Sequence, residues 1–453
     1  MKRARRNQAL PPPGAAATGG GFWSNLADGA VNVPFEPQLL RVDSLHAQLL
    51  RVYVGSERFL SSSWSLTPLE GCVYLQALPG FFAHTGCTIV RGMGLERSKD
   101  GEIVPIVTHR IEVAPGTWSD IPANAMLFVL QGDRHRAVVE IDHCDDHWRI
   151  CVHSAAVDPN RFYEDWQAYA KEHAYLRGRR FYPDGSLIHD QRPIGLDDVI
   201  MAPQTRELVE RVLLPFPQVA EQFRRRGLSA KKGVLFTGKP GTGKTLLCCA
   251  LSNEMPVTCI WVTPRHGENE EAIPFIWRWA RILAPTLIVL EDLDLFATDR
   301  RFGARAGALG ELMNQMDGAE DNDGILTLAT TNCLDSIEDA VQNRPGRFDE
   351  VHEFDGMEES GRRVLLSRYL VDDELEEGVL DTLVGESDGF SGAQVAHLAK
   401  TVLELLSHRQ EHGSKGPARI TLDMAQQAVG GQTSRKDGRM GFASKRAPRA
   451  EAS

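Results

Sequence analysis

Residues 238–245 read GKPGTGKT and satisfy the pattern G-x-x-x-x-G-K-[ST] at every defined position. The apolar run at 233–237 predicts a strand before this octapeptide, and residues 246–251 predict a helix after it. In a loop between a strand and a helix, glycines allow backbone N–H groups to converge on phosphate oxygens, and the helix dipole favours the same negative charge. The stretch therefore predicts an α/β fold with a nucleoside triphosphate site.

Two side chains of the octapeptide have specific expected partners. Lys244 is expected to reach the β- and γ-phosphates, and the Thr245 hydroxyl is expected to occupy one coordination position of Mg²⁺. ATP and Mg²⁺ are therefore the expected ligands. The residues of this stretch expected to bind the nucleotide are Gly238, Pro240, Gly241, Thr242, Gly243, Lys244, Thr245 and Leu246.

Composition limits the class of protein. The chain has 453 residues, enough for two or three domains, and its 42 % hydrophobic content is ordinary for a soluble globular protein. A net charge of −11 argues against a general nucleic-acid binder. The eight cysteines include no Cys-x-x-Cys pair, which favours a reducing, cytoplasmic location. No apolar run approaches the roughly 20 residues of a membrane span.

Changes in composition divide the chain into five parts. Residues 1–24 are basic and then rich in proline and glycine, and residues 433–453 are polar and basic, so both are expected to be disordered. Residues 191–355 alternate apolar strands with helices, which is the pattern of a parallel α/β sheet. Residues 356–432 read as a helical subdomain.

Residues 25–190 predict a separate α+β domain. Turn signals separate several segments rich in β-branched and aromatic residues, and residues 158–176 carry apolar side chains at helical spacing. No known motif falls in this domain. The predicted strands are residues 87–90, 103–113, 126–130, 137–141 and 148–152.

Three further motifs follow the octapeptide. An apolar strand ends in Glu291 and Asp292, where Glu291 is expected to hold Mg²⁺ through water and Asp292 to orient the attacking water. A later strand ends at Asn332, whose amide can bond the γ-phosphate or that water. Arg344 and Arg347 lie in a turn and have the bidentate donors of an arginine finger, although two arginines also occur in ordinary solvated loops.

With these motifs in this order, residues from about 195 to about 429 resemble the AAA family of ATPases, within the AAA+ class. Residues 196–200 are similar to the family's segment beside the adenine, and residues 389–393 are similar to its lid motif. The resemblance implies a P-loop AAA+ parallel-sheet domain with a small helical lid. The α+β N-terminal domain precedes it.

The resemblance also implies roles for individual residues. Asn332 corresponds to the first sensor, and Arg344 and Arg347 correspond to residues that act on the neighbouring subunit's ATP. Arginine fingers that act on the ATP of a neighbouring subunit imply a homo-oligomeric ring, usually a hexamer. The nucleotide pocket is expected to include Val199, Ile200 and Ala393.

The chain departs from the family pattern at four points. The acidic motif reads Glu291-Asp292 instead of Asp-Glu, an order similar to that of mitochondrial AAA translocases that move folded Rieske protein. Residues 261–267 lack the aromatic–hydrophobic–Gly tripeptide of threading unfoldases, and the spacer from Asn332 to Arg344 is one residue longer than usual. No His-Glu-x-x-His is present, so the zinc peptidase of membrane AAA proteases is not expected.

A group of histidines and cysteines raises the question of a zinc site. Zinc takes four nitrogen or sulfur ligands, but the spacing in this group matches no standard zinc pattern. Structural or solvated roles are the favoured interpretation, and a metal site is the alternative. The group consists of His143, Cys144, His147, Cys151 and His153.

Two functions of different class fit these observations. In the first, a ring-forming ATPase converts ATP and water to ADP and phosphate and remodels or translocates, like a chaperone, a protein client selected by the N-terminal domain. In the second, a slow nucleotide-gated assembly or scaffold displays the N-terminal domains without threading a client. The complete octapeptide, sensor and paired arginines favour the first, because each stabilises charge that develops during phosphoryl transfer. The missing tripeptide and the Glu-Asp order favour the second.

Overall fold

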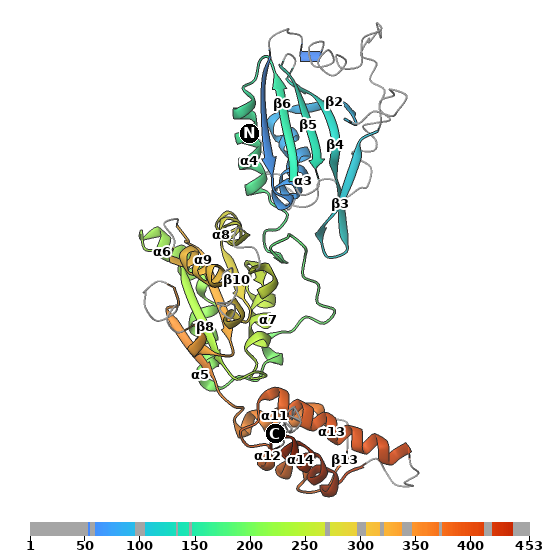
Figure 1. Cartoon of the computed structure of the whole chain (residues 1–453), viewed down its shortest axis with the longest axis vertical. Coiled ribbons are helices and arrows are strands. Elements are labelled where there is room, and N and C mark those ends of the chain that lie inside the picture. The colour runs from blue at the N-terminus through green and yellow to red at the C-terminus, as the bar shows by residue number, and fades with distance from the viewer. Residues whose placement is uncertain are drawn as a thin grey trace, which may run out of the picture.

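The computed structural model describes residues 53–54, 59–95, 105–132, 135–144, 147–267, 272–296, 305–317, 321–337, 347–370, 374–411 and 419–437. In Figure 1 they form three parts along the longest axis: an antiparallel sheet with two helices, a parallel sheet flanked by helices, and a group of helices. This arrangement confirms the expected fold class. Within the described ranges, no helix is both long and apolar enough to cross a membrane.

The N-terminal sheet is antiparallel, with the strand order β1-β6-β5-β4-β2. The long strand β4 pairs with β3 through its first half and with β2 through its second half. The strands are β1 Leu60–Leu66, β2 Cys87–Met93, β3 Val107–Ala114, β4 Thr117–Gln131, β5 His135–Cys144 and β6 His147–Ser154.

Two helices, α3 (Pro68–Thr85) and α4 (Pro159–Glu172), pack against this sheet. Each begins at a proline that follows a capping residue, which satisfies one of the free N–H groups of the first turn. Thr67 caps α3 as half of a capping box with Glu70, and the Asp158 carboxylate caps α4 by accepting from the backbone N–H of Asn160 at 3.0 Å.

Aromatic side chains form the core between the helices and the sheet. Trp148 of β6 and Trp166 of α4 are fully buried, and the indole N–H of Trp166 donates to the Tyr74 carbonyl in α3 at 3.0 Å. Trp64 of β1 stacks on Tyr163 of α4 with ring centroids 4.1 Å apart. These contacts join both helices to the sheet.

The second sheet is parallel, with the order β12-β8-β11-β10-β9-β7. Its central strands are buried along their whole length, as expected of a sheet covered on both faces. The strands are β7 Arg180–Phe181, β8 Lys232–Gly238, β9 Thr258–Val262, β10 Thr286–Leu290, β11 Ile325–Thr331 and β12 Glu350–Phe354. The helices around it are η2 Leu196–Asp198, α5 Pro203–Leu208, η3 Val209–Leu213, α6 Phe216–Arg225, α7 Lys244–Glu254, η4 Pro264–Gly267, α8 Ala272–Ile282, η5 Leu293–Phe296, α9 Arg305–Asp317 and η6 Leu334–Ser336.

The N-terminal domain is joined to the parallel-sheet domain through α8. One hydrophobic core includes buried side chains of both domains. Arg278 of α8 forms an ion pair with the buried Glu70 of α3 at 2.9 Å. Arg177 follows α4 and donates to the last carbonyl of α8, that of Ile282, at 2.7 Å, and to the carbonyl of Glu172 at the end of α4 at 3.0 Å.

The C-terminal helices enclose a core of their own, separate from that of the parallel sheet. A two-stranded parallel ladder, β13 with β14, closes one end. The elements are α11 Glu359–Tyr369, β13 Glu374–Leu375, α12 Val379–Glu386, α13 Gly392–Glu411, β14 Arg419–Ile420 and α14 Leu422–Asp437.

The structure differs from the expected boundaries in three places. Strand β1 and helix α3 have no counterpart in the sequence predictions. Strand β7 lies inside the expected range 25–190 but pairs with β9 of the parallel sheet, because the chain crosses to that sheet before residue 190. Helix α14 runs to Asp437, past the expected end at 432. Residues 1–24 and 438–453 lie outside the described ranges.

Gly71 of α3 supplies a test of the N-terminal core. A Cβ atom at this position would lie 2.0 Å from Cδ1 of Trp148, so Gly71→Ala is expected to lower the free energy of unfolding of this domain by about 1–3 kcal/mol. Urea unfolding followed by near-ultraviolet circular dichroism measures the change. The matched control is Gly385→Ala in α12, where no atom lies within 4 Å and stability should stay level or rise. A Gly71→Ala protein as stable as the parent would contradict the tight contact.

Candidate nucleotide-binding site

The phosphate loop connects β8 to α7 at the carboxyl edge of the parallel sheet. Its glycines adopt left-handed backbone angles, with φ of 138° at Gly238, 79° at Gly241 and 106° at Gly243. A Cβ atom at Gly238 would lie 2.3 Å from the Phe354 carbonyl oxygen. Only glycine is accommodated without strain at such positions, so these residues set the path of the loop.

Lys244, the first residue of α7, is 5 % exposed. Its ammonium donates to the carbonyl oxygens of Gly238 at 2.6 Å and Lys239 at 3.1 Å, and to Oδ1 of Asn332 at 2.9 Å. Burial lowers the pKa of Lys244, and the carboxylates of Asp292 and Asp294 oppose that shift. The protein thus holds a buried cation at the tip of β8.

Asn332 links Lys244 to Asp292. Its side-chain oxygen accepts from Lys244, and its amide nitrogen donates to Oδ1 of Asp292 at 3.0 Å. The backbone N–H of Asp292 in turn donates to the hydroxyl of Thr330 at 3.0 Å. The three side chains follow β8, β10 and β11, which are neighbours in the sheet and end at the same edge. The structure therefore brings these predicted residues together.

Glu291 and Asp292 point to different partners. The carboxylate of Glu291 accepts a hydrogen bond from the indole N–H of Trp261 in β9 at 3.2 Å, whereas Asp292 bonds Asn332. Asp292 has φ of 50°, and among the described residues it is the one non-glycine residue with positive φ. Strained backbone of this kind occurs often at functional sites. The roles expected for the two carboxylates stay predictions.

Asp294 is a site residue to which the sequence analysis assigned no role. Its Oδ1 accepts from the Thr331 hydroxyl at 2.8 Å and from the backbone N–H of Asn332 at 3.0 Å. It therefore holds the end of β11 in place beside the acidic motif. The available signal is its position two residues after Asp292, in the first turn of η5.

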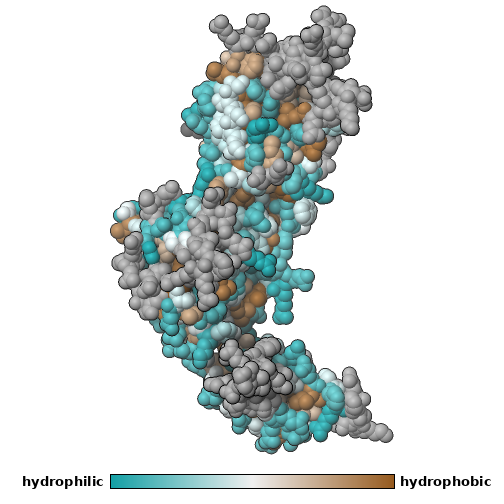
Figure 2. Space-filling model, in the orientation of Figure 1, coloured by the Kyte–Doolittle hydropathy of each residue, from teal (hydrophilic) through white to brown (hydrophobic). Residues whose placement is uncertain are grey.

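A cleft of about 1250 Å³ lies between the parallel-sheet domain and the helical lid. In Figure 2 the surface is hollowed between these two parts. Gly238 and Glu291 are not among its lining residues. The predicted residues that line it are Val199, Ile200, Pro240, Gly241, Thr242, Gly243, Lys244, Thr245, Leu246, Asp292, Asn332 and Ala393.

The lid contacts the parallel-sheet domain at two places beside the cleft: the phosphate loop and η2. The backbone N–H of Ala393 donates to the Gly241 carbonyl at 3.1 Å, and a Cβ atom on Gly241 would lie 2.7 Å from that of Ala393. Arg368 of α11 donates to the carbonyls of Asp197 at 2.9 Å and Asp198 at 3.0 Å. Arg368 was not predicted, because its partners are backbone atoms 170 residues earlier.

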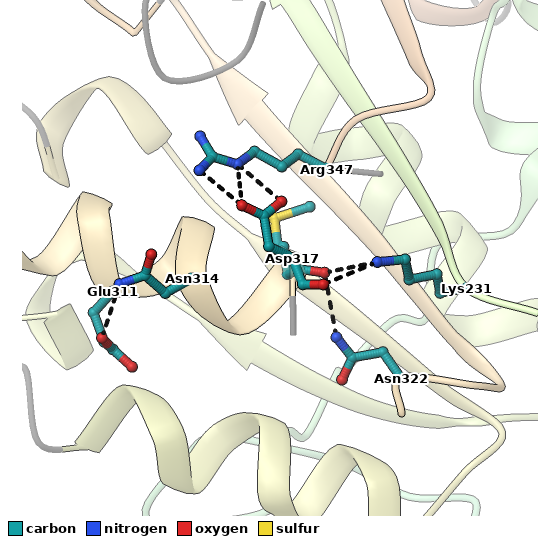
Figure 3. A network of polar contacts seen from close by, with 7 residues as sticks. Lys231, Glu311, Asn314, Asp317, Asn322 and Arg347 are labelled. Atoms are coloured by element: carbon teal, nitrogen blue, oxygen red, sulfur yellow. Dashed lines mark hydrogen bonds and ion pairs between the residues drawn. The ribbon is translucent and has the colours of Figure 1, made fainter. Parts of the chain in front are cut away.

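Of the two arginines predicted to act as fingers, the structure describes Arg347. Arg344 lies outside the described residues. Arg347 is 9 % exposed, and its guanidinium forms three contacts of 2.9–3.1 Å with the carboxylate of Asp317 at the end of α9 (Figure 3). Its expected action on a neighbouring subunit stays a prediction.

Two members of the group of histidines and cysteines, His153 and Cys151, lie against polar side chains of the protein. His153 lies between the hydroxyl of Ser61 at 2.7 Å and the carboxylate of Glu140 at 3.1 Å, and the Cys151 thiol donates to Ser63 at 3.2 Å. In the part of the chain that the structure describes, no three histidine, cysteine or acidic side chains are grouped closely enough to hold a metal ion.

Comparison with known proteins agrees with this geometry. Residues 234–355 match the model of the ATPase family associated with various cellular activities (AAA). The chain is 33 % identical over 228 residues to the 26S proteasome regulatory subunit 6B homolog of Schizosaccharomyces pombe, covering 46 % of this chain and 57 % of that protein. It is 35 % identical over 206 residues to the ATPase family gene 2 protein of Saccharomyces cerevisiae, covering 43 % of this chain and 26 % of that protein.

A third relative is the ATP-dependent zinc metalloprotease FtsH 2 of Thermoanaerobacter sp., 30 % identical over 233 residues, which cover 49 % of this chain and 44 % of that protein. The chain thus spans little more than half the length of the first relative and less than half of the other two. The family match includes the phosphate loop, the acidic strand and the sensor strand described above. Residues 234–355 are therefore an AAA ATPase domain.

Proposed function

We propose that the chain hydrolyses ATP in the cleft between the parallel-sheet domain and the lid. The observation that carries this proposal is the hydrogen-bonded series Lys244–Asn332–Asp292 at the carboxyl edge of three neighbouring strands. It puts a cation, an amide and a carboxylate within reach of one reacting group. A carboxylate at this position could accept a hydrogen bond from the water that attacks the terminal phosphate, as hydrolysis requires.

The residues of the cleft fit Mg·ATP. The three left-handed glycines of the loop carry no Cβ atoms, so they leave room for backbone N–H groups to point toward a bound phosphate. Thr245, half-buried on the first turn of α7, would hold Mg²⁺ together with a carboxylate of the acidic motif. Bound Mg²⁺ would neutralise charge on the β- and γ-phosphate oxygens.

Each side chain of the series has a distinct task in this proposal. Lys244 exchanges its carbonyl partners for phosphate oxygens and stabilises the charge that develops on them. Asp292 accepts a hydrogen bond from the attacking water and orients it, and Asn332 holds that water or the γ-phosphate. Asp294 fixes the backbone of Asn332 and so positions its amide. Glu291, bonded to Trp261, would reach the metal only through water.

We further propose a homo-oligomeric ring, a hexamer by family resemblance, in which Arg344 reaches the neighbouring subunit's ATP. The N-terminal domain would select a protein client, which the ring remodels or translocates in the cytoplasm. The missing aromatic–hydrophobic–Gly tripeptide in residues 261–267 argues against hand-over-hand threading of that client. If hydrolysis proves slow and independent of assembly, the scaffold function replaces this one.

Replacing Lys244 tests the nucleotide site. Lys244→Ala is expected to abolish ATP binding, because Lys244 is the cation that the motif places at the β- and γ-phosphates. Binding is measured by equilibrium titration with a fluorescent ATP analogue. Lys239→Ala, at an exposed lysine of the same loop, is the matched control and should bind normally. Normal affinity of Lys244→Ala for ATP would contradict the assignment of the nucleotide site to this loop.

The acidic pair is tested by two amide substitutions. Asp292→Asn should bind Mg·ATP normally and lose turnover by about 10²-fold or more, as expected for a positioned acid–base group. Glu291→Gln removes charge but keeps an acceptor for Trp261, so its turnover should fall less. Phosphate release under saturating ATP measures both. The opposite ranking would exchange the two roles.

Dependence on assembly is tested by dilution and by mixing variants. Turnover per subunit should rise with protein concentration, and Arg344→Ala should lose about 10³-fold or more in turnover with ATP binding nearly intact. Mixing Arg344→Ala with Lys244→Ala should partly restore hydrolysis, because some interfaces then pair an intact phosphate loop with an intact arginine. Sedimentation with simultaneous phosphate-release measurements follows both effects. A monomer with a concentration-independent rate would contradict the ring.

A further inference from the structure

Charged side chains from two other elements hold the two ends of η2. At its start, the carboxylate of Glu254, the last residue of α7, accepts from the Leu196 N–H at 2.6 Å. At its end, the Arg368 guanidinium of α11 donates to the carbonyls of Asp197 at 2.9 Å and Asp198 at 3.0 Å. A helix leaves N–H groups free at its start and carbonyls free at its end, which an anion and a cation satisfy respectively. The conformation of η2 thus depends on both α7 and the lid.

The guanidinium suits this position because it bridges two carbonyls of consecutive residues. Its Nη2 donates to Asp197 and its Nη1 to Asp198, so one planar group fixes the direction of both carbonyls. The Asp198 carboxylate closes the turn from within by accepting from the Gly195 N–H at 3.0 Å. Residues 195–198 therefore form a defined turn, and Arg368 fixes it to the lid.

Helix α11 contacts this segment at a second point. A Cβ atom on Gly361 would lie 3.2 Å from Cγ2 of Ile200, so α11 lies directly on the Ile200 side chain. Gly361 and Arg368 are two helical turns apart and lie on the same face of α11. On the other side, Val199 is buried in the core of the parallel-sheet domain. Residues 196–200 are thus enclosed between that core and the lid.

The base of a bound nucleotide would lie against this segment. The phosphate loop occupies one part of the cleft, so the base must lie among the remaining lining residues. Several of these residues are apolar and come from both the segment and the lid, which suits a flat aromatic base. They are Val199, Ile200, Met357, Leu365 and Ala396. Glu254 and Arg368 therefore hold one wall of this part of the cleft.

We propose that Glu254 and Arg368 are positioning residues for the base of the nucleotide, and that Arg368 makes base binding depend on the docked lid. The inference rests on the proposed nucleotide site and adds the residues that shape its base side. Coupling of this kind is reciprocal, so a bound base stabilises the docked lid as much as the docked lid stabilises the bound base. The phosphates depend on a different contact of the lid, the 3.1 Å hydrogen bond from the Ala393 N–H to the Gly241 carbonyl.

Arg368→Met tests the lid side of the proposal, because methionine keeps an unbranched side chain and removes the donors. Its affinity for ATP should fall by about tenfold, the loss expected for hydrogen bonds from a charged group, whereas its affinity for Mg·tripolyphosphate, which has no base, should stay unchanged. Displacement of a fluorescent ATP analogue by ATP and by Mg·tripolyphosphate measures both affinities. The matched control is Arg363→Met in the same helix, which breaks a 2.7 Å pair with Asp381 inside the lid and should leave both affinities unchanged.

Glu254 is tested with an uncharged acceptor. Glu254→Gln keeps an oxygen for the Leu196 N–H and should retain its ATP affinity within about threefold, whereas Glu254→Ala removes the acceptor and should lose about tenfold. The combination of Glu254→Ala with Arg368→Met should lose less than the product of the two single losses, because each variant frees the same short turn. Equal losses in Glu254→Gln and Glu254→Ala would contradict the role of Glu254 as an acceptor for η2.

Two results would overturn the role of Arg368. The first is parental ATP affinity in Arg368→Met. The second is an equal loss of affinity for ATP and for Mg·tripolyphosphate, which would mean that Arg368 supports the whole cleft and not its base side. Arg368→Lys, whose single ammonium replaces the two-pronged group, gives the same comparison if Arg368→Met does not fold. Failure of the proposed nucleotide site gives a different result, because ATP would then bind Lys244→Ala as tightly as the parent.

Discussion

A buried ammonium at the tip of β8 determines the geometry of the nucleotide site. Lys244 is almost fully enclosed, and a cation removed from water must be surrounded by oxygen atoms. Two backbone carbonyls and the Asn332 amide meet this need in the protein alone. The requirement explains why Asn332 stands at the end of the neighbouring strand and why Asp292 lies just beyond it. Phosphate oxygens would satisfy the same ammonium in place of the two carbonyls.

Local motifs made most of the parallel-sheet domain predictable from sequence. The phosphate loop needs glycines at fixed positions, and parallel strands must end at one edge, so Lys244, Asp292 and Asn332 could be grouped without a structure. The same reasoning does not show that Glu291 and Asp292 have different protein partners, because that difference accompanies a left-handed backbone angle at Asp292. That angle turns one carboxylate toward Asn332 and leaves the other on Trp261.

Other features depend on contacts that no local pattern encodes. Helix α3 is apolar on nearly every face and contains Pro79, so it shows neither helical periodicity nor a typical helix interior. Strand β1 is mostly serine. Asp317 and Arg347 are 30 residues apart, and only the fold shows that the arginine has a partner in its own subunit. From the turn sequence alone, the same arginine looks available to a neighbour.

The junction at α8 has a mechanical consequence. Arg177 bonds the carboxyl ends of both α4 and α8, Glu70 pairs with Arg278, and the surrounding apolar side chains form one continuous core. Rotation of the N-terminal sheet as a rigid body would have to expose that core and break both polar contacts at once. A force applied to the N-terminal domain is therefore carried into α8 and the parallel sheet through these contacts, and residues 173–179 between α4 and β7 need bear little of it.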